Sequence, residues 1–210
     1  MLAFFDSKPF YILLLITIVG EFLLPWILGH FRRGYNGKTM VMSALGSPES
    51  PVRIIYNLWL VWLGIFLLLT SFALYHEIRV VSEILAVLTW ISTAVFAIGA
   101  GILAGIFSVN EKKEKVTLAS KIHGAGSAMG FMTLLFFPLL QGIYGFMTGQ
   151  SIKGAVCMVS FVLAFLFFVF FIMGDKEKFK ETVFSYEGLW ERLSLFFMYV
   201  PFLCLAVENF

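Results

Sequence analysis

The sequence comprises 210 residues, of which 60% are hydrophobic and 13% are charged, and its formal net charge is +2. Soluble domains contain about 45–50% apolar and about 25% charged residues. This composition excludes a water-soluble globular domain and predicts an integral membrane protein.

The apolar residues are grouped into six long runs. A membrane-spanning helix needs about 20 such residues, because each residue rises about 1.5 Å through a hydrocarbon layer about 30 Å thick. Continuous runs such as Phe161–Phe171 lack the alternation of β-barrel strands. We therefore expect an all-α fold, in which residues 1–210 form a single integral membrane bundle of six transmembrane helices. The predicted spans are Phe10–His30, Ile54–Tyr75, Val80–Phe107, Ala119–Met147, Ile152–Met173 and Tyr186–Val207.

Basic residues gather beside alternate connections. Twelve of the 15 lie in or beside the first, third and fifth connections, and the other three are Lys8, Arg79 and Lys153. Because cytoplasmic loops are enriched in lysine and arginine, we expect these three connections in the cytoplasm and both termini outside. The expected location is the plasma membrane. The run Asn110–Lys115 is expected to be a solvated loop.

The first span contains an acidic residue, Glu21, near its middle. A charge there costs at least a few kcal/mol, so Glu21 should face the bundle and find a hydrogen-bond donor. Pro25 cannot donate to the Glu21 carbonyl, so we expect a kink at this point. Two interpretations stay open: proton coupling or substrate contact, and a protonated acid that bonds a neighbouring helix.

A polar loop, Met42–Pro51, precedes the second span. Ser50 can cap this helix, with Pro51 in its first position. Arg53 and Asn57 follow Ser50 at helical spacing, so the three residues should share one face.

The fourth span begins with His123 and Ser127, which lie one helical turn apart. A nucleophile, a base and an acid could be assembled from Ser43 or Ser47, His123, and Glu49. A histidine that bonds a neighbouring carbonyl is the structural alternative.

Two glycine patterns predict that the third and fourth spans pack closely. They are Gly101-Ile-Leu-Ala-Gly105 and Gly126-Ser-Ala-Met-Gly130. The spacing of the three histidines supports no metal site. Cys157 and Cys204 lie inside predicted spans and are expected to be packing residues.

Several short segments together resemble the membrane-protein family called domain of unknown function 998. The similarity covers nearly the whole chain and implies a compact polytopic bundle without an assigned general activity. The segments are Ser43-Ala-Leu-Gly46, Ser50-Pro51, Asn57, Gly105-Ile-Phe107, His123-Gly-Ala-Gly126, Phe131 and Gly188-Leu-Trp-Glu-Arg192.

A more remote resemblance is to the Frag1/DRAM/Sfk1 group of six-helix proteins, whose members are linked to lipid remodelling and membrane organisation. It rests on the serine-glycine-proline loop before the second span and on the histidine that begins the fourth. Ala44 stands where that pattern commonly has an acidic residue, and Ser108 where it has a proline. These departures weaken the transfer of a catalytic role to the loop.

The leading functional hypothesis is a polar pocket at one membrane face that binds or processes a lipid head group. His123 is the expected proton-transfer residue and Ser43 the expected nucleophile. Arg53 and Arg192 would hold an anionic group. The expected substrate-binding residues are Ser47, Glu49, Arg53, Asn57, Ser127 and Arg192.

The alternative hypothesis is a proton-coupled small-molecule transporter or membrane sensor that uses Glu21. A carrier would need a path from the pocket past Glu21 to the other membrane face, whereas an enzyme would need His123 beside a serine or water. Membrane lipid is the expected partner. We expect no metal, cofactor or nucleic acid; protein partners and enzymatic activity stay open.

Overall fold

The computed structural model describes residues 2–5, 7–110 and 116–209. Within these ranges every regular element is a helix, and six helical segments are long and apolar enough to cross a membrane. The prediction of an all-α membrane bundle is confirmed. The spans are Lys8–Gly29, Arg53–Ile78, Glu83–Ile106, Leu118–Met147, Ser151–Gly174 and Glu187–Glu208. Of the basic run Asn110–Lys115, residues 111–115 lie outside the described ranges.

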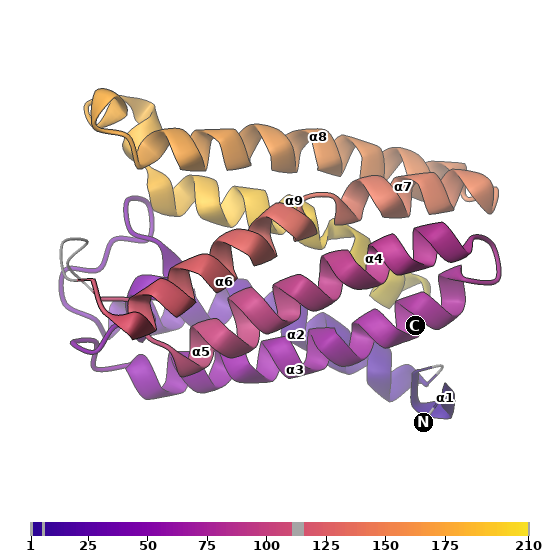
Figure 1. The fold of residues 1–210 in the computed structure, drawn as a ribbon, viewed down its shortest axis with the longest axis horizontal. Helices are drawn as coiled ribbons and strands as arrows, with labels where there is room; N and C mark the ends of the chain where they lie inside the picture. Colours follow the sequence, from indigo (N-terminus) through magenta and orange to yellow (C-terminus); the bar gives the residue numbers. More distant parts are fainter. Residues whose placement is uncertain (1, 6, 111–115, 210) are drawn as a thin grey trace.

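The spans lie side by side along the long axis of the molecule (Figure 1). Four of them are single helices: α2 (Lys8–His30), α3 (Arg53–Ile78), α8 (Ser151–Gly174) and α9 (Glu187–Glu208). The third consists of α4 (Glu83–Phe96), the π-helix η2 (Ala97–Leu103) and α5 (Ala104–Ile106). The fourth consists of α6 (Leu118–Leu134) and α7 (Phe137–Met147).

The two ends of the bundle differ. We use "connection end" for the end that holds residues 31–52, 107–110, 116–117 and 175–186. We use "terminal end" for the end that holds the turns 79–82 and 148–150 together with α1 (Leu2–Phe5). The connection end also carries three short 3-10 helices, η1 (Met42–Gly46), η3 (Glu177–Phe179) and η4 (Val183–Ser185).

Proline has different effects in the first and fourth spans. The fourth span is interrupted at Leu135–Phe136, because Pro138 has no N–H to donate to the carbonyl of Leu134. By contrast, α2 continues through Pro25 to His30. The interruption therefore falls in the fourth span, which the sequence had suggested to be continuous.

Helix α3 begins two residues after the start that a Ser50 cap would give. Its first residue is Arg53 and the preceding residue is Val52, which provides no side-chain cap. The prediction that Ser50 caps this helix is wrong, because Ser50–Val52 form a turn in which the Ser50 carbonyl accepts from the Arg53 N–H. The Ser50 hydroxyl is buried without a hydrogen-bond partner among the described residues.

Glycines bring the third span close to both of its neighbours. Gly99 meets the backbone of Gly126 on α6, and Gly130 packs on Ala100. Gly101, in contrast, packs against Gly64 of α3. Close packing of the third and fourth spans is thus present, but it uses Gly99 and Ala100 rather than the Gly101–Gly105 pair, which faces α3.

The bundle core lies where α2, α3, α4, α7 and α9 meet. Its largest fully buried side chains include Leu14, Leu67, Phe137, Tyr199 and Phe202. Helix α8 is buried mostly in the half toward the terminal end, at Lys153, Gly154, Cys157, Ser160 and Ala164. This asymmetry leaves space beside α8 at the connection end.

Candidate functional site

A cavity of about 450 Å³ extends from the connection end toward the middle of the bundle. Its walls come from α2, α3, the third span, α6, α8, α9 and the segment around η1. Most of the lining is apolar. The polar lining residues are Glu21, Ser43, Tyr56, His123, Ser127, Asp175, Lys176, Glu187 and Glu191.

The cavity also reaches the outer surface of the bundle between α6 and α8. Ala128 and Met132 of α6, with Ile172 of α8, line it and are at the same time exposed on the outside. These two helices diverge toward the connection end in Figure 1. They approach each other where the rings of Phe131 and Phe171 stack, with centroids 6.3 Å apart. The opening lies on a surface that faces lipid.

His123 is fixed by the end of the third span. Its Nδ1 lies 2.8 Å from the carbonyl oxygen of Phe107 and 3.2 Å from that of Ala104. Because a carbonyl only accepts, Nδ1 carries the proton, and the neutral ring keeps Nε2 as an acceptor. Ser127 and Ser43 line the same cavity, but no hydrogen bond joins either serine to His123 among the described residues.

Glu21 lies on the cavity wall near mid-bundle, and only 3% of its surface is exposed. Its Oε2 accepts a hydrogen bond of 2.8 Å from the indole N–H of Trp59 on α3. Gly20 makes this contact possible, because a Cβ at that position would overlap the Trp59 ring. Glu21 thus faces the bundle and has a donor, as its position in the first span requires.

Glu191 connects α9 to the first connection. Its Oε2 accepts a 2.7 Å hydrogen bond from the backbone N–H of Met42, the first residue of η1. The carboxylate is buried and lines the cavity. It therefore holds η1, and with it Ser43, at the mouth of the cavity.

Arg192 Nη1 lies 3.9 Å from the Glu191 Oε2, but the other contacts of its guanidinium are outside the cavity. Arg192 lines a separate groove beside Trp26 and Tyr35, not the cavity. Its guanidinium donates to the carbonyls of Gly37 (2.8 Å), Met40 (3.2 Å) and Gly188 (2.7 Å), and to the Tyr35 hydroxyl (2.5 Å). Burial raises the pKa of Tyr35, and the nearby Arg192 charge opposes this effect.

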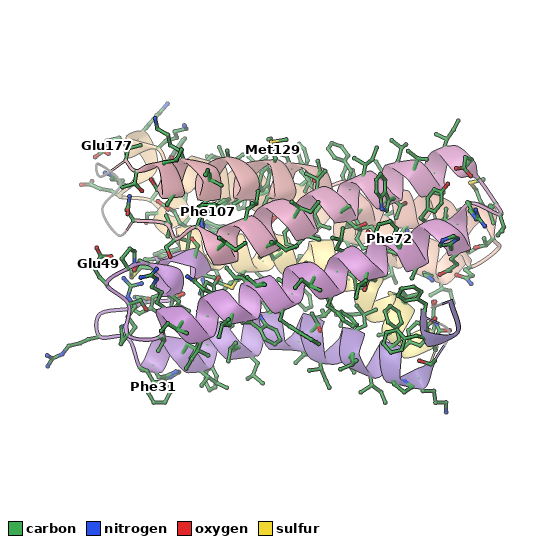
Figure 2. The ribbon with its side chains drawn as sticks, turned by 60° about the horizontal axis from the view of Figure 1, so that its bottom comes forward. Phe31, Glu49, Phe72, Phe107, Met129 and Glu177 are labelled. Atoms are coloured by element: carbon green, nitrogen blue, oxygen red, sulfur yellow. The ribbon has the colours of Figure 1, made fainter. Side chains whose placement is uncertain are left out.

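The other predicted binding residues lie outside the cavity lining. Glu49 and Arg53 are exposed, and Figure 2 shows Glu49 at the connection end. Ser47 is buried, and its hydroxyl has no partner among the described residues. Asn57 donates to the Ser108 hydroxyl at 3.1 Å and packs on Gly46. The structure thus brings together Glu21, Ser43, His123, Ser127 and Glu191, and separates them from Ser47, Glu49, Arg53, Asn57 and Arg192.

Three charged lining residues were missed by sequence reasoning: Asp175, Lys176 and Glu187. Asp175 and Lys176 belong to the fifth connection, and Glu187 lies at the start of the sixth predicted span. Their signal in the sequence was weak, because charged residues next to a span are ordinary. Trp59 was also missed as the donor to Glu21, since a tryptophan in an apolar run is equally typical of packing.

The described residues include no group of three histidine, cysteine, aspartate or glutamate side chains placed to hold a metal ion. The chemistry available in the cavity is therefore that of carboxylates, hydroxyls, one amine and one imidazole among apolar walls. This arrangement can bind a molecule with one polar end and one apolar end.

Comparison with known proteins places the chain in a family without an assigned activity. The model for proteins of unknown function DUF998 matches residues 16–208. No curated protein and no solved structure matched the chain. The matched range includes all the polar residues that line the cavity. The chain therefore belongs to the DUF998 family of proteins of unknown function.

Proposed function

We propose that the cavity binds one amphipathic molecule, such as a membrane lipid, that enters from the bilayer between α6 and α8. One observation supports this function above all. The same cavity carries most of its polar groups at the connection end, has mainly apolar walls deeper in the bundle, where Glu21 is bonded to Trp59, and reaches a lipid-facing surface. Its volume of about 450 Å³ lies within the range of about 300–1,000 Å³ typical of small-molecule sites.

The charges at the mouth favour a particular kind of head group. Glu187, Glu191 and Asp175 line the cavity together with Lys176, and Glu191 also pairs with Arg192 at 3.9 Å. Arg53 and Arg192, which were expected to hold an anionic group, lie outside the lining. A head group that carries an ammonium or several hydroxyls suits these acceptors better than an anion does.

Binding is better supported than catalysis. A nucleophile needs a base within about 2.6–3.2 Å, and the hydrogen bonds of His123 go to backbone carbonyls. His123 Nε2 can accept a hydrogen bond from a bound hydroxyl or amine. We therefore assign His123 to orientation of the polar end rather than to proton transfer.

No feature of the cavity supports the carrier hypothesis. Toward the terminal end from Glu21, the side chains of Leu14, Ile18 and Leu67 are fully buried in the core. A transported molecule would have to displace this packing. Glu21 therefore lies at the inner wall of the cavity, and packed side chains close the cavity between Glu21 and the terminal end.

Photo-cross-linking tests the proposal. The protein would be reconstituted in vesicles that contain a phospholipid with a diazirine in its acyl chain, irradiated, digested and mapped by mass spectrometry. We expect adducts on Leu60, Phe96 or Ala100, which line the cavity and are buried from surrounding lipid. Adducts confined to lipid-facing residues such as Val162 and Phe165 would contradict it.

A further inference from the structure

We propose that Cys157 and Cys204 form a reversible disulfide that links α8 to α9 near the terminal end of the bundle. This site is separate from the cavity, and the inference does not depend on the proposed function. The chain contains two cysteines, and both are free thiols in the structure.

The register of two antiparallel helices brings the thiols together. Lys153 of α8 and Glu208 of α9 form an ion pair of 2.6 Å. Cys157 follows Lys153 by one helical turn, and Cys204 precedes Glu208 by one helical turn. The two cysteines are therefore the next facing pair toward the middle of the bundle. This register places the two cysteine side chains next to each other. The ion pair and the tight packing of α8 on α9 hold this register.

The two sulfur atoms differ in their exposure at the surface of the bundle. Cys204 is partly exposed and lines a shallow hollow of about 640 Å³ beside the turn that joins α7 to α8. Cys157 is completely buried. A small disulfide can therefore reach Cys204 first, and Cys157 is placed to resolve the mixed disulfide.

The chemistry balances with a disulfide of low molecular weight as oxidant. The Cys204 thiolate attacks oxidised glutathione, forms a mixed disulfide and releases one glutathione thiolate. The Cys157 thiolate then attacks the Cys204 sulfur and expels the second glutathione. Two electrons pass from the protein to glutathione, and the two thiol protons end on the released glutathiones. The distribution of basic residues predicts the terminal end outside the cytoplasm, where disulfides persist.

The disulfide would tie down α8, a helix that also borders the cavity. At its other end, α8 forms one side of the lateral opening. A bond at Cys157 would fix the terminal end of α8 on α9 and leave the connection end unaffected. The oxidised protein should therefore be more stable than the reduced one.

A thiol count in defined redox buffers tests this inference. The purified protein would be equilibrated with oxidised and reduced glutathione, quenched with acid, denatured and treated with a polyethylene-glycol maleimide that shifts its electrophoretic band. We expect wild type to take up two reagents when reduced and none when oxidised. Cys157→Ser and Cys204→Ser, which each retain one cysteine, should not show this concerted loss.

Thermal stability supplies the second readout. Oxidation should raise the unfolding midpoint of wild type by roughly 5–10 °C and leave that of Cys204→Ser unchanged. The partly exposed position of Cys204 keeps this control usable if Cys157→Ser does not fold. Two reactive thiols in oxidised wild type, or disulfides between chains in place of the internal one, would overturn the inference.

Discussion

At the scale of single residues, the neighbours Glu191 and Arg192 on α9 make different contacts. Glu191 lines the cavity and accepts from the Met42 backbone, whereas Arg192 lines a separate groove and donates to three carbonyls and a phenol. The two side chains also form an ion pair of 3.9 Å. Together they attach the first connection to α9. The sequence predicted a binding role for Arg192, but it could not show that Glu191 lines the cavity and Arg192 does not. That depends on the rotation of α9 against the loop.

Arg192→Lys should therefore destabilise the protein rather than weaken a ligand. A lysine amine cannot reproduce the planar set of donors that contacts Gly37, Met40, Gly188 and Tyr35. We expect a loss of about 2–3 kcal/mol in the free energy of unfolding in mild detergent. The matched control is Arg53→Lys, because Arg53 is exposed and should tolerate the change. Equal effects of the two substitutions would contradict this assignment.

Tyr35 gives the Arg192 contacts a defined pH dependence. Burial raises its pKa above the ordinary value of 10.0, so the folded protein holds this proton more tightly than the unfolded chain. Its contribution should be constant below about pH 10 and should be lost as the pH rises further. Thermal unfolding of wild type and Tyr35→Phe between pH 7 and about pH 11 measures this, and the alkaline decline should be smaller in the variant. An identical decline in both would exclude the role of Tyr35.

At the scale of helices, backbone contact through glycine determines how the third span is placed. The π-helix η2 directs Gly99 toward Gly126 of α6 and Gly101 toward Gly64 of α3. Small residues recurring in the sequence predicted close packing of these helices. They could not predict which glycine faces which neighbour, because a π-helix changes the angular spacing of every residue that follows it.

Gly99→Ala should be more harmful than Gly124→Ala. A Cβ at Gly99 would overlap the carbonyl of Gly126, whereas a Cβ at Gly124 meets nothing within 4 Å. We expect Gly99→Ala to cost about 1–3 kcal/mol through overpacking, and Gly124→Ala to be neutral within about 0.5 kcal/mol. Thermal unfolding in detergent compares them. A neutral Gly99→Ala would show that this helix contact is loose.

At the scale of the whole molecule, the bundle is well packed at the terminal end and open beside α8 at the connection end. Composition and run length predicted the membrane bundle, because burial in lipid imposes both. A polar pocket at one membrane face was expected, but its opening between α6 and α8 could not be predicted, since the opening results from the divergence of these two helices and not from any motif. For the same reason Glu21 and His123 were found as polar residues, but their shared cavity was not.

The orientation of the bundle in the membrane stays a prediction of its charges. A C-terminal fusion to alkaline phosphatase, which is active outside the bacterial cytoplasm, should be active, and a fusion to green fluorescent protein should be dark after export. A fusion within the first connection should give the opposite pattern. The reverse result at both positions would overturn the predicted orientation of the termini.

Native mass spectrometry of the protein released from mild detergent tests lipid binding most directly. We expect wild type to retain one lipid, and Ala128→Trp, whose indole would fill the opening between α6 and α8, to lose most of it. Met129→Trp is the matched control, because Met129 lies on the outer surface of the same helix (Figure 2) and does not line the cavity. Retention that is equal in Ala128→Trp and wild type, or absent from wild type, would contradict a lipid-binding cavity.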